Sequence, residues 1–142
     1  MTIGTERLDR MIFSAGNYSA DCEAMLLPLV SAYEPGYVRC VHTIDARFAN
    51  ANRVVFGGYV AALLDYVSGY TAMTMILDDK VCSTAELSIS YFRPCAPGEE
   101  LVLEGFLINQ SRRSYHIEAT IKRQDQKLIS KARAVFALSP RT

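Results

Sequence analysis

The stretch VVFGGYVAALLDYVSGYTAMTMIL, residues 54–77, decides how the rest of the chain must fold. It is too long for a strand and rich in helix-compatible residues, so we predict a helix that begins near Phe56 or Gly57. Asp65 is the one charged residue within it. A lone carboxylate is costly to bury unless it is paired or used. Asp65 is therefore the first candidate functional residue.

The bulk composition fits one soluble domain. The chain has 142 residues, half of them hydrophobic, and 15 basic residues balance 15 acidic ones. A neutral chain gives no electrostatic case for nucleic acid or a membrane surface. Residues 54–77 could span a bilayer by length, but a mid-span Asp costs about 2.5–3.5 kcal/mol on insertion scales. We therefore expect a helix buried inside a soluble protein, with no membrane partner.

The cysteines and the N-terminus indicate the compartment. The four cysteines form no CxxC pair and there are only two histidines, so no metal site is expected. Buried thiols suit a reducing cytoplasm. The N-terminal residues carry mixed charges and no long apolar run, so no secretory signal is expected. We therefore expect a cytoplasmic protein.

The order of elements predicts an α+β fold in a single domain, residues 1–142. Residues 1–28 read as a short helical extension, with helices at 5–15 and 22–28, and residues 29–46 as two extended pieces. Four strands are predicted after the central helix by alternating or continuous apolar runs; they cover residues 81–92, 100–109, 114–123 and 128–138. Only this antiparallel sheet of five to six strands can cover the apolar helix.

The helix offers two functional parts that cannot cooperate on one chain. The N–H groups at Gly57 and Gly58 and the positive end of the helix dipole suit a developing oxyanion. Asp65 lies eight residues on, about 12 Å along the axis, whereas reacting groups need about 3–3.5 Å. If both parts serve one reaction, Asp65 must act at the Gly57 of a second chain, which implies a two-fold dimer. A carboxylate satisfied by loop amides or an arginine is the structural alternative.

The pattern N-x₅-F-G-G-x₆-D, from Asn50 to Asp65, resembles the signature of the hot-dog-fold acyl-CoA thioesterases of the phenylacetate-degradation type. The run STAELSISYFRPCAPGEELVLEGFLINQSRRS, with its Arg-Pro and Pro-Gly pairs, is also similar to a segment of that family. The resemblance covers about residues 29–139. It implies a hot-dog fold, in which the sheet wraps one long helix, and hydrolysis of acyl-CoA to the free acid and coenzyme A. It implies no metal or redox cofactor.

The resemblance also implies roles for individual residues. The Gly57 N–H would polarise the thioester carbonyl, and Asp65 of the partner subunit would act as nucleophile or general base. Asn50 would help to place the substrate or water. Residues near the substrate or the attacking water would be Phe56, Gly58, Ser83 and Thr84. Coenzyme A would lie across the interface of a homodimer, or of a tetramer built from two dimers, with phosphate ligands among Arg93, Arg112 and Arg113.

Two positions depart from the family pattern. Phe56 stands where the family has His, and Arg53 where it has Gly. The first change removes a polar side chain beside the thioester, so a non-catalytic acyl-CoA-binding protein is the alternative function. A hot-dog dehydratase or hydratase would need a histidine, and neither His42 nor His116 is near the helix in sequence.

The acyl group is not specified by these residues. Three tyrosines of the helix could line an aromatic or medium-chain acyl pocket or could simply pack the helix: Tyr59, Tyr66 and Tyr70.

Overall fold

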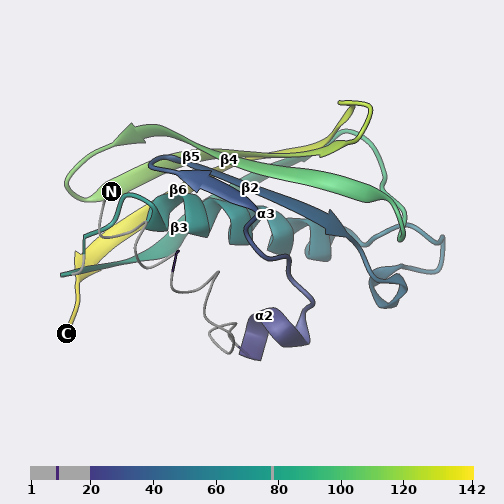
Figure 1. The fold of residues 1–142 in the computed structure, drawn as a ribbon, viewed down its shortest axis with the longest axis horizontal. Coiled ribbons are helices and arrows are strands. Elements are labelled where there is room, and N and C mark those ends of the chain that lie inside the picture. The colour runs from purple at the N-terminus through teal and green to yellow at the C-terminus, as the bar shows by residue number, and fades with distance from the viewer. Residues whose placement is uncertain (1–8, 10–19, 78) are drawn as a thin grey trace.

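The structure, a computed structural model, describes residue 9, residues 20–77 and residues 79–142. Six strands form one antiparallel sheet in the order β1-β2-β4-β5-β6-β3, and the long helix α3 lies across one face of it (Figure 1). The predicted α+β plan, with an antiparallel sheet around one central helix, is confirmed. The helix expected at residues 5–15 lies outside the described residues except for residue 9, as does most of the extension predicted for residues 1–28.

The described elements have the following bounds. The strands are β1 (Ala32–Glu34), β2 (Tyr37–Thr43), β3 (Lys80–Tyr91), β4 (Glu100–Gln110), β5 (Ser114–Arg123) and β6 (Leu128–Pro140). The helices are α2 (Ala20–Ala24), the 3₁₀ turn η1 (Ala46–Phe48) and α3 (Gly57–Met73).

Helix α3 begins at Gly57, as the sequence indicates, and ends earlier than expected. Phe56 is the N-cap in an extended conformation, with φ −69° and ψ 148°. The apolar run continues to Leu77, but the helix ends at Met73, and Thr74 is its C-cap. The Thr74 hydroxyl donates to the Thr71 carbonyl at 2.6 Å and accepts the Gly36 N–H at 2.8 Å. The end of the helix is thereby fixed to the β1–β2 turn.

The core lies between α3 and the inner face of the sheet. Leu63, Leu64 and Val67 of α3 are fully buried there. The closest approach is at Gly105 of β4, where an added Cβ would come within 2.0 Å of the Thr71 Oγ1. The missing side chain at Gly105 therefore sets how closely the helix can pack on the sheet.

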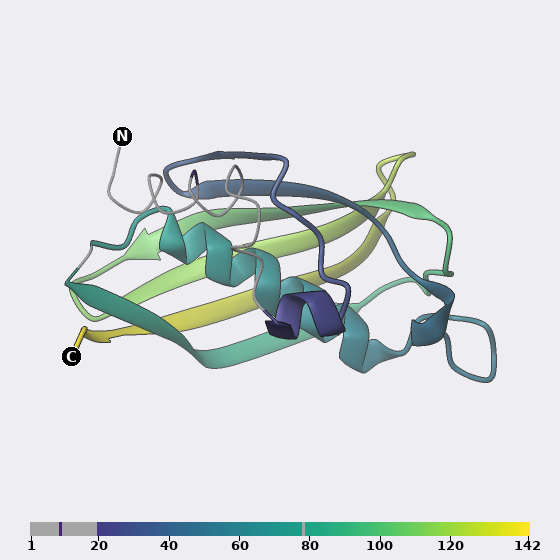
Figure 2. The ribbon, with the colours of Figure 1, turned by 60° about the horizontal axis from the view of Figure 1, so that its bottom comes forward.

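Helix α2 lies on the side of α3 that faces away from the sheet, as Figures 1 and 2 show. It ends at Ala24 and not at Pro28, since Leu26 takes a positive φ of 50°. Two tyrosines of α3 hold the segment that follows: the Tyr59 hydroxyl donates to the Leu26 carbonyl at 3.0 Å, and the Tyr66 hydroxyl donates to the Pro28 carbonyl.

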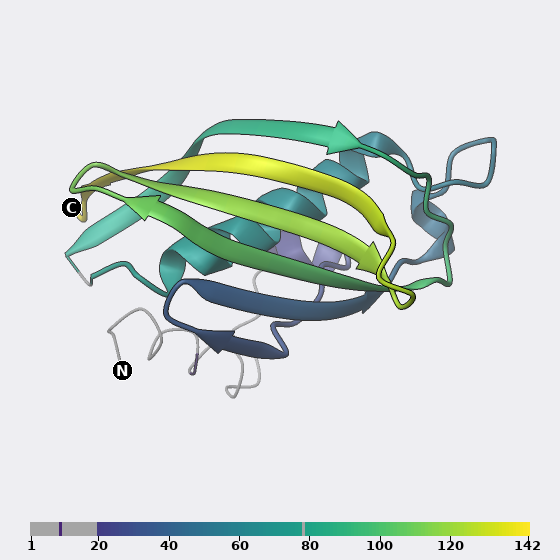
Figure 3. The same ribbon diagram turned by 90° about the horizontal axis from the view of Figure 1, so that it is seen from above.

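Strand β3 forms a long open edge of the sheet. It pairs with β6 on one side and is the last strand in the sheet order (Figure 3). The edge runs for twelve residues, most of them exposed, and carries no proline. Such an edge is a template for a further strand.

Candidate active site

The N-terminus of α3 presents backbone donors at the surface. The N–H groups of Tyr59 and Val60 both reach the Phe56 carbonyl, at 3.1 and 3.4 Å. The N–H groups of Gly57 and Gly58 precede them and have no acceptor within the helix. Both glycines are exposed, so these two donors can meet a ligand oxygen.

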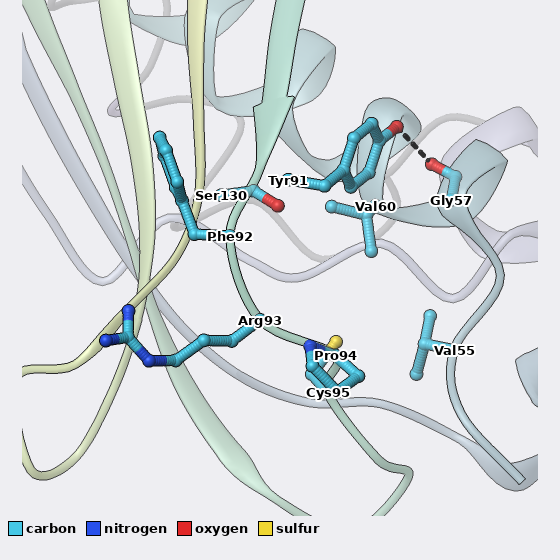
Figure 4. A pocket seen from close by; sticks show the side chains of 9 residues that line it. All are labelled: Val55, Gly57, Val60, Tyr91, Phe92, Arg93, Pro94, Cys95 and Ser130. Carbon is cyan, nitrogen blue, oxygen red and sulfur yellow. Dashed lines mark hydrogen bonds between the residues drawn. The ribbon is translucent and has the colours of Figure 1, made fainter.

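Tyr91, at the end of β3, holds this helix end in place. Its hydroxyl donates to the Gly57 carbonyl at 2.7 Å, and its ring lies 3.5 Å from the position that a Gly57 Cβ would take. Beside this contact is a cavity of about 260 Å³. Figure 4 shows it between the start of α3 and the chain from Tyr91 to Cys95, with Ser130 of β6 at its back.

Asp65 lies further along α3, beside the start of β3. The Thr84 hydroxyl donates to the Asp65 carboxylate at 2.7 Å, so the carboxylate has a hydrogen-bond partner. The Asp65 residue is half-buried. The carboxylate lines a second cavity, of about 290 Å³. The other residues that line this cavity are mostly apolar and aromatic: Cys22, Tyr66, Gly69, Tyr70, Met73, Cys82, Ser83, Thr84 and Phe136.

The two cavities lie at opposite ends of β3 within one chain. Tyr91 lines the Gly57 cavity, and Thr84 lines the Asp65 cavity. Seven residues separate these two positions on the strand, about 23 Å at 3.3 Å per residue. No side chain can bridge that distance.

Not all predicted residues reach the two cavities. Ser83 and Thr84 line the cavity that contains Asp65, whereas Asn50 lines neither cavity. The Asn50 Oδ1 instead accepts the N–H groups of Asn52 and Val54, at 2.9 and 3.3 Å, and so organises the loop before α3. The Phe56 ring is 43% exposed and lies against Phe48, with ring centroids 6.4 Å apart.

The backbone conformation at Arg53 bears on one departure from the family pattern, the arginine in place of glycine. Its φ is +62°, in the left-handed region that favours glycine. The loop therefore keeps the conformation that a glycine would give, although the residue is an arginine. Its N–H donates to the Asn50 carbonyl at 2.9 Å, which closes the same turn.

The three arginines do not gather at one place on the chain. Arg93 follows β3 and donates to the Leu128 carbonyl at 2.8 Å. Arg112 and Arg113 form the β4–β5 turn, where the Arg113 carbonyl accepts the Leu138 N–H at 2.9 Å. Leu128 and Leu138 are ten residues apart on β6, about 33 Å along the strand. Arg93 shares the Gly57 end of the sheet, and the other two share the Asp65 end.

The histidines lie away from both cavities. The His42 Nε2 is 3.3 Å from the Tyr59 hydroxyl, and burial lowers the pKa of His42 from its ordinary value. His116 is exposed on the outer face of the sheet, where it lines a larger hollow of about 410 Å³ that contains none of the candidate residues. A dehydratase that depends on a histidine therefore has no support from the two cavities.

Two residues at the site were missed by the sequence reasoning. Tyr91 alternates in phase with Leu87 and Ile89 in the sequence, which was the available signal, but the alternation does not indicate its bond to Gly57. Ser130 is in phase with the buried Ala132 and Ala134 of β6, and a polar residue in that phase was a signal that could have been used. Of the helix tyrosines, Tyr59 packs in the core, stacked on Phe48, whereas Tyr66 and Tyr70 line the Asp65 cavity.

Over residues 20–77 and 79–142, no cluster of three His, Cys, Asp or Glu side chains is placed to hold a metal ion. Among the helices that the structure describes, none has the length and apolar character to cross a bilayer.

A family model described as the Thioesterase superfamily matches residues 52–130, a segment that contains Gly57, Asp65, Thr84, Tyr91 and Ser130. The chain belongs to the Thioesterase superfamily. The curated proteins include no match to this thioesterase-superfamily chain.

Solved structures are similar to this thioesterase-superfamily protein over most of its length. A phenylacetic acid degradation-related protein of Ralstonia eutropha is 24% identical, with 92% of this chain and 98% of that chain covered and a TM-score of 0.82. The PaaI protein of E. coli is 17% identical, with 94% and 97% covered and a TM-score of 0.76. The Streptococcus mutans protein smu.793, solved bound to acetyl CoA, is 20% identical, with 79% and 88% covered and a TM-score of 0.73. The resemblance to hot-dog thioesterases of the phenylacetate-degradation type is thus confirmed.

Proposed function

We propose that the protein hydrolyses acyl-CoA thioesters as a homodimer, with each centre built from Gly57 of one subunit and the partner subunit's Asp65. The Gly57 N–H would bind the thioester oxygen as negative charge develops on it. In one route the carboxylate would attack the carbonyl carbon, giving a mixed anhydride and coenzyme A thiolate; water would then hydrolyse the anhydride and supply the proton of the thiol. In the other route the carboxylate would take a proton from the attacking water and pass it to the leaving sulfur, so that coenzyme A leaves as the thiol.

The observation that carries this proposal is the position of the two parts along the open edge of β3. Asp65 is tied to Thr84 near the start of the strand, and Gly57 is tied to Tyr91 at its end. Leu87 and Ser88 lie midway between these two contacts. If a second copy pairs antiparallel on this edge, centred near Leu87 or Ser88, the partner subunit's Thr84 lies opposite a residue from Ser90 to Phe92. That pairing would bring the partner subunit's Asp65 to the Gly57 cavity.

The arginines support the same pairing. Within one chain, Arg93 is about 33 Å of strand away from Arg112 and Arg113. An antiparallel copy would reverse the ends, so that the partner subunit's Arg112 and Arg113 approach the end that carries Arg93. Guanidinium groups suit phosphates, so the set could hold the phosphates of coenzyme A. The acetyl CoA bound to the similar S. mutans protein is consistent with such a ligand.

The structure allows a clean test of the oxyanion donor. Gly57 is the first residue of α3, a position that tolerates proline, and Phe56 is already in the extended conformation that precedes proline. Gly57→Pro therefore removes the N–H while preserving the helix. Gly57→Ala keeps the N–H and adds the same Cβ, whose nearest neighbours are atoms of the Tyr91 side chain, at 3.5 Å.

We expect Gly57→Pro to lower kcat by about 10²–10³, as the loss of one oxyanion donor does elsewhere, and Gly57→Ala to stay near the parent. Asp65→Asn should lower kcat by orders of magnitude. The exposed Glu34→Gln on β1, at the opposite edge of the sheet, should have no effect. Hydrolysis of acetyl-, butyryl- and phenylacetyl-CoA is the measurement. Parental turnover by Asp65→Asn would refute the assigned chemistry.

An acyl-CoA-binding protein without catalysis is the second candidate, and Phe56 is the observation that favours it. An exposed phenyl ring occupies the position directly before the helix N–H groups. Calorimetric binding of the same CoA esters with no hydrolysis of any of them would support this second function over the first.

A further inference from the structure

The cavity beside Gly57 contains a buried hydroxyl that forms no hydrogen bond. Ser130 is 0% exposed, and its Oγ has no hydrogen-bond partner among the described residues. Most buried hydroxyls in proteins are paired, and an unpaired one is destabilising. Ser130 lines the cavity, and Figure 4 shows its oxygen pointing toward Val60, into the space beside Tyr91.

A bulge in β6 builds this corner of the cavity. Ile121 of β5 faces Ser130 and Lys122 faces Leu128, so Ile129 is the extra residue. The Ile129 carbonyl accepts two N–H groups, from Phe92 at 2.9 Å and from Arg93 at 3.2 Å. Bulges re-aim side chains near functional sites. Here the bulge leaves Ile129 and Ser130 both buried and fixes the chain directly after Tyr91.

The rest of the cavity favours a short group. Val55, Val60 and Cys95 form apolar walls, and the volume is about 260 Å³. Arg93 also lines the cavity, but its guanidinium donates to the Leu128 carbonyl. Cys95 is buried, and burial raises the pKa of its thiol, so this wall carries no charge near neutral pH. Such a space is at the small end of ligand pockets and cannot take the charged nucleotide of coenzyme A. The group that fits is the acyl group of a thioester held at the Gly57 N–H.

We infer that this cavity is the acyl site and that Ser130 selects acyl groups bearing a hydroxyl or keto oxygen. The inference rests on the proposed function and goes further by naming the substrate class. An acyl oxygen would give the Ser130 hydroxyl the hydrogen bond that it lacks. A site built to pair with a substrate hydroxyl discriminates against the analogue without it, because its own polar group is then left unpaired.

The test compares matched acyl-CoA pairs on the parent and on Ser130→Ala. Butyryl-CoA is paired with 3-hydroxybutyryl-CoA, and phenylacetyl-CoA with 4-hydroxyphenylacetyl-CoA, so that the oxygen is near the thioester in one pair and far in the other. We expect the parent to prefer the oxygenated member of at least one pair about ten-fold in kcat/KM. Ser130→Ala should abolish that preference and melt at an equal or higher temperature, since an unpaired hydroxyl has been removed.

Ser68→Ala is the matched control, because Ser68 is also fully buried with an unpaired Oγ but lies on α3 away from this cavity. It should also melt at an equal or higher temperature and should keep the acyl preference of the parent. A parent without any preference, or a preference that survives Ser130→Ala, would overturn the inference. An equal rise in KM for both members of each pair would also overturn it, since the hydroxyl would then contact the pantetheine amides.

Calorimetric binding of the same four esters separates this inference from the proposed function. If no ester is hydrolysed but the parent binds an oxygenated member about ten-fold more tightly and Ser130→Ala does not, the acyl site stands and the hydrolase proposal fails. If the esters are hydrolysed without any such difference, the hydrolase proposal stands and the acyl site fails.

Discussion

Thr84 donates its hydroxyl hydrogen to the Asp65 carboxylate across 2.7 Å, which joins the start of the edge strand β3 to the middle of the central helix. A hydrogen bond to a charged group is stronger than one between neutral groups and fixes the direction of the carboxylate. The bond also fixes the position of Asp65 relative to the β3 edge, where the proposed dimer forms.

Thr84→Val should therefore lower kcat by about ten-fold or more, because a hydrogen bond to a charged group contributes about 1.5–3 kcal/mol. KM should change less than kcat, since the residue orients the attacking group. Thr84→Ser restores the hydroxyl and should recover most of the rate. Steady-state kinetics on a hydrolysed CoA ester is the measurement. Thr43→Val, at an exposed site on β2, is the control. Equal kcat in Thr84→Val and the parent would contradict the assigned role.

Arg53→Gly should stabilise the protein. Arg53 has a φ of +62°, and the left-handed conformation costs a residue with a Cβ about 1–2 kcal/mol. Glycine avoids that cost but loses more entropy on folding, so we expect a net gain of about 0.5–1 kcal/mol in the free energy of unfolding. Urea unfolding gives the value. The exposed Arg47→Gly, at a residue with no positive φ, should bring no such gain.

Gly105→Ala should destabilise the protein severely. The new Cβ would lie 2.0 Å from the Thr71 Oγ1 and 3.1 Å from the Val67 carbonyl oxygen. Overpacking of this kind typically costs about 1–3 kcal/mol, and here a backbone atom must also move. Gly69→Ala is the matched comparison, because its Cβ meets only the Phe136 ring, at 3.7 Å, and alanine favours the helix. Thermal melting should show a large decrease for the first variant and none for the second.

The buried His42 should lower the stability of the folded protein at acid pH. Burial lowers its pKa in the folded state, so the unfolded chain binds the proton more readily. Above the ordinary histidine pKa near 6.5, His42 is neutral in both the folded and the unfolded chain, so it does not change the free energy of unfolding with pH. The free energy of unfolding then decreases as the pH falls from 6.5 through the lower pKa of the folded state. His42→Gln should reduce the loss of melting temperature between pH 7.5 and pH 5.5, and His116→Gln, at an exposed site, should leave it unchanged. Identical pH profiles for His42→Gln and the parent would contradict this prediction.

Ser88→Glu should weaken the proposed dimer. Ser88 is exposed near the middle of β3, and a two-fold pairing centred on it would place it beside the partner subunit's Ser88. Like charges that face each other across a strand pair are destabilising. Sedimentation at low salt concentration should show that the variant dimer dissociates more than the parent dimer. The rate of hydrolysis should also be lower, although Asp65 is unchanged. Ala32→Glu on β1, the opposite edge strand, is the control. A parent chain that is monomeric and fully active would refute the paired edge.

The sequence predicts the plan of the fold well because the plan depends on periodicity. The long apolar run gives α3, and the alternation of β3, β5 and β6 gives the sheet around it. Contacts between segments that are distant in the sequence are harder to predict. Thr74, the C-cap of α3, accepts the Gly36 N–H, and the local sequence pattern does not contain this contact.

The same limit applies to the site. Asp65 and Gly57 were found because a charge and a glycine pair are conspicuous in an apolar helix. The bond from Tyr91 to Gly57, the unpaired hydroxyl of Ser130 and the loop contacts of Asn50 depend on how segments meet in space. The distance between Arg93 and the β4–β5 turn likewise follows from the sheet order, which the sequence left open.

The separation of Gly57 and Asp65 along β3 has a genetic consequence. If each centre takes its amide from one chain and its carboxylate from the other, two inactive variants should complement each other. A dimer of one Gly57→Pro chain and one Asp65→Asn chain would hold one centre with both defects and one with neither. Random re-association of an equal mixture would then restore about a quarter of the parental centres, whereas centres confined to single chains would stay inactive in any mixture.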